Sequence, residues 1–243
     1  MAPDLSTIEI VGVAGAGKST LARLLRSEHG CEIADSLHTR LPAHWPYVLH
    51  GLPGLAPLVA ESARNRPLLS WDELKFVLYV AEWHRYLRYE RDGRTSGTVV
   101  LDQGPVFALA CLIWGRKPVT QSSRYETWQR RMVERWALEL DAIVLLDAPD
   151  ETLLSRIDSR TQKHDVKGAR RAQGLELVER HRRAYGQVLG QLEEFGRPRL
   201  LRYDTATMPA AAIAADLAET LAAGATQPKE GRKMAGEARP EPT

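Results

Sequence analysis

The stretch from Gly12 to Thr20, which reads Gly-Val-Ala-Gly-Ala-Gly-Lys-Ser-Thr, constrains the fold of this chain more than any other. It fits the pattern G-x-x-x-x-G-K-[ST] and follows directly on an apolar run, Ile8 to Val13. Glycines let a backbone turn tightly and aim successive N–H groups at an anion. The residues after the loop, Lys18 to Arg26, carry apolar side chains at helical spacing. A strand, a phosphate-binding loop and a helix are therefore predicted in that order.

The residues of this loop predict a nucleotide di- or triphosphate as the ligand. We expect the amino group of Lys18 to reach the outer phosphates as a point charge. We expect the hydroxyl of Ser19 to enter the coordination shell of Mg²⁺. The residues expected to hold the nucleotide are Gly12, Gly15, Ala16, Gly17, Lys18, Ser19 and Thr20. The loop alone does not indicate what the nucleotide is used for.

Length and composition favour one domain. With 243 residues and 44% hydrophobic content, the chain can bury one substantial core. We expect this domain to cover residues 1–223, with a lid near 156–171. Residues 224–243 are almost free of apolar side chains, so we expect a disordered tail there, with a docking peptide as the alternative.

Charge, cysteines and hydropathy narrow the choice of partners. Lys and Arg total 33 against 31 Asp and Glu, and the resulting net charge of +2 does not favour a nucleic-acid partner. Cys31 and Cys111 form neither a metal-ligand cluster nor a disulfide framework, so both are expected to be buried thiols of a reducing compartment. The first residues lack a targeting pattern, and no run of about eighteen apolar residues occurs. We expect a soluble, cytoplasmic protein that binds a small molecule and neither nucleic acid nor membrane, with a homodimer left open.

Short apolar runs that alternate with longer helical patterns predict an α/β fold with three layers, a five-stranded parallel sheet and a helical lid. Strands are expected at Thr7–Val13, Cys31–Asp35, Thr98–Asp102, Ala142–Asp147 and Arg199–Asp204. Helices are expected near Lys18–His29, Trp71–Arg91, Pro105–Trp114, Ser123–Leu140, Asp150–Arg160, Gly174–Phe195 and Pro209–Ala222. The segment Leu41–Pro67 is rich in Pro, Gly and His, and we predict that it is irregular or a broken helix.

Aspartates end four of the five predicted strands, at the edge where open α/β sheets bind ligands. Asp102 closes the hydrophobic strand Thr-Val-Val-Leu-Asp, so we expect it to supply the second Mg²⁺ contact, with helix capping as the alternative. Asp35 is either a base that accepts a proton from an attacking hydroxyl or a capping residue that forms a turn with Ser36. The other two, Asp147 and Asp204, fit capping and turn roles.

A basic segment runs from Arg156 to Arg171. On a helix, Arg156 and Arg160 share a face because they are four residues apart, so both could reach the charge that builds on a transferring phosphoryl group. The Lys, Gly and Arg residues that follow suit a mobile lid. A solvated helix face is the alternative explanation of such a run of charges.

Aromatic side chains form a stripe along the predicted helix Trp71–Arg91. The stripe consists of Phe76, Tyr79, Trp83, Tyr86 and Tyr89. Spacings of three and four predict a helix that faces the core. Tyr79 and Trp83 are the candidates for a second role, which is to line a pocket and stack on a planar acceptor.

With these residues in order, the chain resembles the thymidylate kinase and deoxynucleoside kinase branch of the P-loop kinases over roughly residues 7–222. The resemblance is carried by the loop Gly12–Thr20, by Asp35, by Val-Val-Leu-Asp102, by the string Ile-Val-Leu-Leu-Asp-Ala-Pro-Asp-Glu-Thr-Leu-Leu-Ser-Arg156-Ile-Asp-Ser-Arg160 and by Leu-Leu-Arg-Tyr-Asp204-Thr. It implies MgATP as the donor and an acceptor bound between the Trp71–Arg91 helix and the lid. It also implies that Arg156 and Arg160 grip the donor phosphates and that Asp204 lies near the adenine.

Two departures from the family pattern concern the acceptor. Members usually carry an Arg after the acid of strand three, whereas this chain has Gln103, which cannot supply that positive charge. Members usually carry Glu-Pro after strand two, whereas this chain has Asp35-Ser36. An enzyme that phosphorylates a non-nucleotide hydroxyl compound therefore stands beside a nucleoside or nucleotide kinase as an interpretation.

Two other functional classes compete with phosphoryl transfer. A GTP-dependent switch is suggested only by Gln162-Lys163-His164-Asp165, which resembles the guanine-reading pattern N-K-x-D but does not follow a predicted strand. A regulatory protein that binds ATP without transfer is suggested by the missing Arg after Asp102. We therefore predict ATP-dependent transfer to a small acceptor, with Lys18, Asp35, Asp102, Arg156 and Arg160 as catalytic residues and with Ser19 and Asp102 as metal ligands.

Overall fold

The computed structural model describes residues 6–34, 45–64, 70–91, 97–115, 122–159 and 171–224. Two predicted site residues, Asp35 and Arg160, lie outside these ranges. So do most of the expected lid, the four residues 162–165 and nearly all of the expected tail.

Five parallel strands form one sheet with the order β2-β3-β1-β4-β5. The strands are β1 (Ser6–Gly12), β2 (Glu32–Ile33), β3 (Thr98–Asp102), β4 (Ala142–Asp147) and β5 (Arg199–Asp204). In register, Ile10 lies opposite Asp102, and Asp147 lies opposite Asp204. The carboxyl ends of four strands therefore meet at one edge, and the predicted parallel sheet is confirmed.

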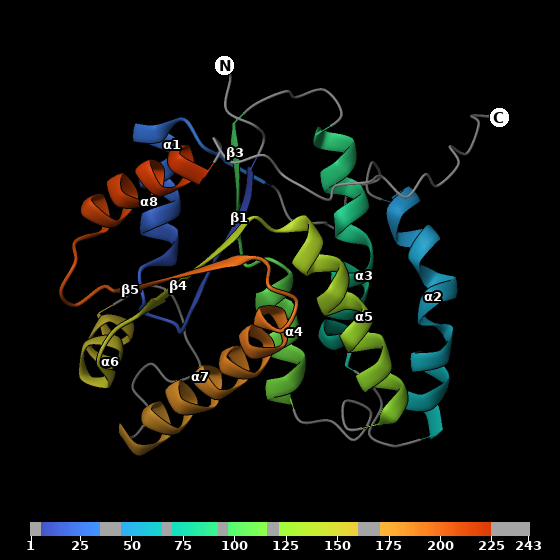
Figure 1. Ribbon diagram of the computed structural model, residues 1–243. Helices are drawn as coiled ribbons and strands as arrows, with labels where there is room; N and C mark the ends of the chain where they lie inside the picture. Colours follow the sequence, from blue (N-terminus) through green and yellow to red (C-terminus); the bar gives the residue numbers. More distant parts are fainter. Residues whose placement is uncertain are drawn as a thin grey trace.

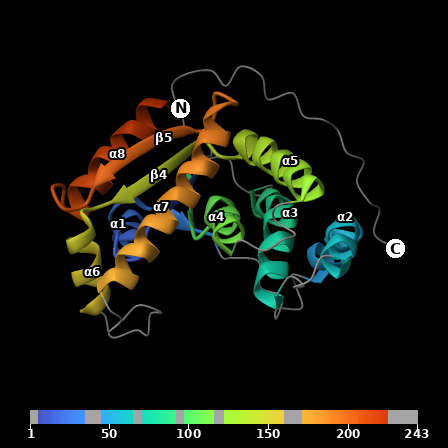
Figure 2. The same cartoon turned by 90° about the horizontal axis from the view of Figure 1, so that it is seen from below.

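Helices cover both faces of the sheet, which gives the three layers that the sequence predicts (Figure 1). They are α1 (Lys18–His29), α2 (Trp45–Arg64), α3 (Trp71–Arg91), α4 (Pro105–Gly115), α5 (Ser123–Glu139), α6 (Asp150–Asp158), α7 (Arg171–Glu193) and α8 (Ala210–Gly224). One face carries α1 and α8, and the other carries α7, α4, α3 and α5, with α2 outermost against α3 (Figure 2).

Alternation along the strands divides the core between the two faces. Ile8 and Ile10 of β1 pack with the side chains of α1 and α8, whereas Val11 faces the cluster formed with α3, α4, α5 and α7. Glu9 takes a position on this second face that alternation reserves for an apolar side chain, yet it is completely buried. A buried carboxyl group needs hydrogen-bond partners.

The helix α2 corrects one expectation. The sequence Leu41–Pro67 was expected to be irregular or a broken helix, but Trp45–Arg64 forms one continuous helix of 20 residues that contains Pro53 and Pro57. A proline inside a helix costs about 3 kcal/mol. Leu55 and Leu58 of α2 are buried in the core, and burying two leucines contributes on the order of 4 kcal/mol. The two prolines together cost about 6 kcal/mol, so the burial of these leucines offsets about two thirds of the local penalty.

The predictions for the aromatic stripe and for the two cysteines can be compared with the burial of their side chains. Trp83 is fully buried against Tyr79 and Trp136, with ring centroids 4.1 and 6.1 Å away. The core interpretation is thus confirmed for Tyr79 and Trp83, and neither is among the residues that line the cavity between α4, α5 and α7. Both cysteines are free, and Cys31 is buried as expected, whereas Cys111 is only half-buried.

Candidate active site

The phosphate-binding loop joins β1 to α1 through glycines in left-handed conformations. The φ angle is positive at Gly12, Gly15 and Gly17. A Cβ atom on Gly12 would lie 2.2 Å from the carbonyl oxygen of Leu146 on β4, so this position tolerates only glycine. The motif thus forms a tight turn between a buried strand and the amino end of a helix, which is the geometry that an anion requires.

Lys18 places its charge on the loop. Its Nζ atom donates to the carbonyl oxygens of Gly12 at 2.7 Å and of Val13 at 3.2 Å. From α7, Tyr185 places its hydroxyl near the backbone of Gly12, and burial raises the pKa of this phenol, so it stays neutral. Tyr185 could not be predicted as a site residue, because the sequence pattern shows it only as one of several large side chains on the buried face of a helix.

Ser19 and Asp102 meet beside the loop, as the prediction of two metal ligands requires. The Ser19 hydroxyl donates to Oδ2 of Asp102 at 3.3 Å. The other carboxylate oxygen of Asp102, Oδ1, is buried and has no hydrogen-bond partner. A buried carboxylate oxygen without a partner is costly, and a hydroxyl beside a carboxylate is the donor set that Mg²⁺ prefers. The two side chains therefore fit a magnesium ion.

Arg156 of α6 bridges the loop and the end of β5. Its guanidinium donates to Oγ1 of Thr205 at 2.8 Å, to the carbonyl of Thr205 at 2.9 Å and to the carbonyl of Gly15 at 3.4 Å. Arg156 is half-buried in this position. The structure brings it together with the loop, whereas its contact with phosphates stays a prediction.

Two of the aspartates at strand ends bind backbone N–H groups that follow them. Asp204 accepts from the N–H of Ala206, two residues further on, at 2.8 Å, which confirms its turn role. Asp147 accepts from the N–H of its neighbour Ala148 at 2.9 Å, and α6 begins after Pro149 without a side-chain cap, so a capping role of Asp147 is not seen. Contact between Asp204 and a nucleotide stays a prediction.

Arg182 of α7 fastens the turn after β4 and is a second residue that sequence reasoning missed. It donates to the carboxylate of Asp147 at 2.9 and 3.1 Å and to the carbonyl of Ala148 at 2.7 Å. It also contacts the carboxylate of Asp150, the first residue of α6. A predicted helical pattern shows that Arg182 lies on α7 but does not show which distant acid it meets.

The turn after β3 has an unusual conformation. Gln103 is exposed and has a φ angle of 65°, in the left-handed region that non-glycine residues rarely adopt. Its carbonyl oxygen accepts a hydrogen bond of 3.2 Å from the hydroxyl of Tyr79 on α3. The side chain that replaces the expected Arg therefore projects from a fixed turn next to Asp102.

Glu9 of β1 is a third residue that sequence reasoning missed. Its Oε2 accepts from the N–H of Val106 and its Oε1 from the N–H of Phe107, both at 2.9 Å, so the carboxyl group caps the amino end of α4. Burial, with a smaller contribution from the nearby charge of Asp102, raises the pKa of Glu9 to about 8 against the opposing effect of the backbone N–H groups. The sequence does contain a signal that could have revealed Glu9, which is an acidic residue inside an otherwise apolar strand.

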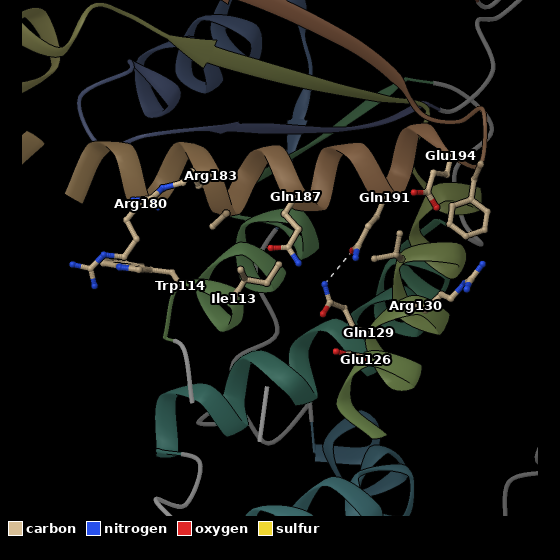
Figure 3. A pocket seen from close by; sticks show the side chains of 13 residues that line it. Ile113, Trp114, Glu126, Gln129, Arg130, Arg180, Arg183, Gln187, Gln191 and Glu194 are labelled. Atoms are coloured by element: carbon tan, nitrogen blue, oxygen red, sulfur yellow. Dashed lines mark hydrogen bonds between the residues drawn. The ribbon is translucent and has the colours of Figure 1, made fainter. Parts of the chain in front are cut away.

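A cavity of about 670 Å³ lies elsewhere, between α7, α5 and the end of α4 (Figure 3). Polar side chains dominate its lining, among them Gln129, Gln191, Arg130, Arg180 and Arg183. The described lining residues include none from the phosphate-binding loop. Three arginines and two glutamates are among the residues that line it, so its charge is mixed.

The described part of the chain contains neither a metal-binding cluster nor a membrane-spanning helix. No group of three or more His, Cys, Asp or Glu side chains there is arranged to hold a metal ion by itself. The helices of the same ranges are each too short or too polar to cross a bilayer.

Comparison with known proteins supports the fold. No protein-family model and no curated protein matches the sequence. Among solved structures, a thymidylate kinase from Candida albicans aligns with a TM-score of 0.55 and 13% identity, over 92% of this chain and 93% of that chain. Structures of deoxyadenosine kinase from M. mycoides with bound dATP and with bound dCTP align with TM-scores of 0.48 and 0.49 and with 15% and 16% identity. Each of these two alignments covers 88% of this chain and 98% of the deoxyadenosine kinase chain.

At such low identity the likeness concerns the fold alone. The similarity to the thymidylate kinase extends over nearly the whole of both chains. In this chain the motif Gly12–Thr20 follows β1, the central strand of the sheet. The chain therefore has the fold of this kinase, an α/β P-loop fold with a five-stranded parallel sheet.

Proposed function

We propose that this chain is an ATP-dependent phosphotransferase that moves the γ-phosphoryl group of MgATP to a small acceptor, with a nucleoside or nucleoside monophosphate as the first candidate. The observation that carries the proposal is the meeting of Ser19 and Asp102 beside the loop, with one buried oxygen of Asp102 left without a partner. This arrangement fits a metal ion next to the outer phosphates of a nucleotide.

Residues at both ends of the loop support ATP as the donor. The loop N–H groups and Lys18 suit the phosphates. Arg156 donates both to the carbonyl of Gly15 in the loop and to Thr205 after β5, where we place the adenine end of the donor. A planar guanidinium both stacks on a base and binds phosphate oxygens, so Arg156 is assigned to the donor.

The transfer itself needs little covalent chemistry from the protein. The acceptor oxygen attacks the γ-phosphorus in line, the bond from this phosphorus to the β–γ bridging oxygen breaks, and ADP leaves with the electron pair. Mg²⁺ held by Ser19 and Asp102 would neutralise charge on the phosphates. A hydroxyl acceptor must also lose a proton, and Asp35 or Asp102 is the base that we propose for it.

The acceptor side favours a second candidate reaction, which is phosphorylation of a non-nucleotide hydroxyl compound. The observation behind it is Gln103, an exposed, uncharged amide on the fixed turn next to Asp102. An amide donates and accepts hydrogen bonds but does not neutralise an acceptor phosphate. An acceptor without a phosphate group therefore suits Gln103 better than a phosphorylated acceptor.

Consumption of MgATP by the purified protein tests both candidates. The reaction is measured alone and with deoxynucleosides, nucleoside monophosphates and unrelated hydroxyl compounds, with Lys18→Ala as the inactive control. Stimulation by a deoxynucleoside or monophosphate would support the first candidate, and stimulation only by another hydroxyl compound would support the second. Tight ATP binding without any stimulation would instead support a regulatory ATP-binding protein, and a preference for GTP would refute ATP as the donor.

A further inference from the structure

We propose that Glu9 is a positioning residue of the site, which holds the turn Asp102–Gly104 through the amino end of α4 and so keeps Asp102 directed at Ser19. Glu9 acts through backbone atoms and does not touch the nucleotide. The effect of Glu9 on metal binding rests on the proposed function. The proposal adds Glu9, a residue outside the loop, to those that shape the site.

Burial and hydrogen bonds show how Glu9 is used. The side chain is completely buried on a central strand, where an apolar residue is expected. Each carboxyl oxygen accepts one N–H group from the first turn of α4, from Val106 and Phe107. These are donors that a helix cannot satisfy by itself, so the carboxyl group fixes where α4 begins.

Close packing shows that the turn is built around this carboxyl group. A Cβ atom on Gly104 would lie 2.5 Å from the carboxyl carbon of Glu9, a distance that atoms do not adopt without contact strain. Only glycine therefore permits the turn to approach Glu9 so closely.

Strain in the same turn explains why it needs external support. The left-handed conformation of Gln103 costs roughly 1–2 kcal/mol for a residue with a side chain. The turn is held on one side by the hydroxyl of Tyr79 and on the other by Glu9. Without Glu9, we expect the turn to relax and the carboxylate of Asp102 to leave its position at Ser19.

The variant Glu9→Gln tests this role because it keeps the size of the side chain and replaces one acceptor oxygen by a donor, which cannot bind an N–H group. The matched control is Val99→Ala, which removes buried apolar atoms from β3 but leaves the capping bonds in place. Two readouts are measured. The first is hydrogen exchange of the Val106 and Phe107 amides, and the second is ATP affinity by calorimetry with Mg²⁺ and with EDTA.

For Glu9→Gln we expect faster exchange at both amides and a loss of the Mg²⁺-dependent gain in ATP affinity by about 10–100-fold, as for other residues that orient metal ligands. The affinity for metal-free ATP should stay as in the wild type, and Val99→Ala should keep the full Mg²⁺ effect. A merely structural role would weaken both affinities together or neither, and this result would overturn the proposal.

Two further outcomes keep the proposal and the proposed function separate. If Glu9→Gln does not fold, Gly104→Ala pushes a methyl group against the carboxyl group from the other side, and a full Mg²⁺ effect in this variant would overturn the role of Glu9. If the wild type binds no ATP, the proposed function fails. The capping role is then decided by the amides alone, and it fails if their protection is unchanged in Glu9→Gln.

Discussion

The buried carboxyl group of Glu9 makes the stability of this protein depend on pH in an unusual direction. Its pKa rises from the ordinary value of 4.5 to about 8 in the folded chain. Between these two values the folded protein keeps a proton that the unfolded chain has released, so stability is lost as the pH rises through this window. Most buried, paired acids have the opposite effect, because pairing lowers their pKa.

The variant Glu9→Gln isolates this contribution because an amide does not titrate. At roughly 1.4 kcal/mol per pH unit, the free energy of unfolding of the wild type should fall by about 3–4 kcal/mol relative to the variant between pH 5 and pH 8. Burial raises the pKa of Tyr79 and Tyr185, so both phenols stay neutral in this range and do not contribute to the pH dependence of the free energy of unfolding.

Urea unfolding at pH 5, 6, 7 and 8, followed by tryptophan fluorescence, measures this difference. Other titrating groups are common to both proteins and cancel in the difference, and Val99→Ala should follow the slope of the wild type. Parallel curves for the wild type and Glu9→Gln would show that Glu9 is already ionised in the fold, and would refute the reasoning from burial.

Four other substitutions test the remaining residues. Ser19→Ala should weaken MgATP binding by about tenfold or more while leaving metal-free ATP unaffected, since only the metal contact is lost; calorimetry with and without EDTA decides. Arg156→Lys keeps the charge but breaks the paired bonds to Thr205, so thermal unfolding should show a loss of about 1–2 kcal/mol, and an unchanged melting temperature would count against this contact. Gln103→Gly should raise the free energy of unfolding by about 1 kcal/mol because glycine adopts a φ of 65° without strain, and a decrease would contradict it. Asp35→Asn should lower turnover with little change in ATP affinity, and unchanged turnover would remove Asp35 from the mechanism.

Local sequence signals predicted the parts of the site that are continuous in the chain. The loop Gly12–Thr20 and Asp102 at the end of its strand follow from glycine spacing and from hydrophobic alternation, and both lie where the parallel sheet places them. The segment of α2 was misjudged because its prolines are a local signal, while the burial of Leu55 and Leu58 depends on distant helices.

Residues that act through long-range contacts could not be found in this way. Glu9 meets the amino end of a helix almost a hundred positions further along the chain, and Arg182 meets an acid that precedes it by 35 positions. Composition and periodicity describe each residue in its own element. The partner across the fold becomes visible only when the two elements are placed side by side.

The position of β1 also affects how the chain folds during synthesis. Among the five strands of the sheet this one is made first, yet it lies at the centre, where Ser6 pairs with Thr98 and Gly12 pairs with Leu146. At about 5–20 residues per second, the ribosome needs on the order of ten seconds to produce both neighbouring strands. Throughout this time the apolar residues of β1 have no sheet to join, and such non-local pairing slows folding. We therefore expect the loop Gly12–Thr20 to reach its folded shape only after β4 has emerged.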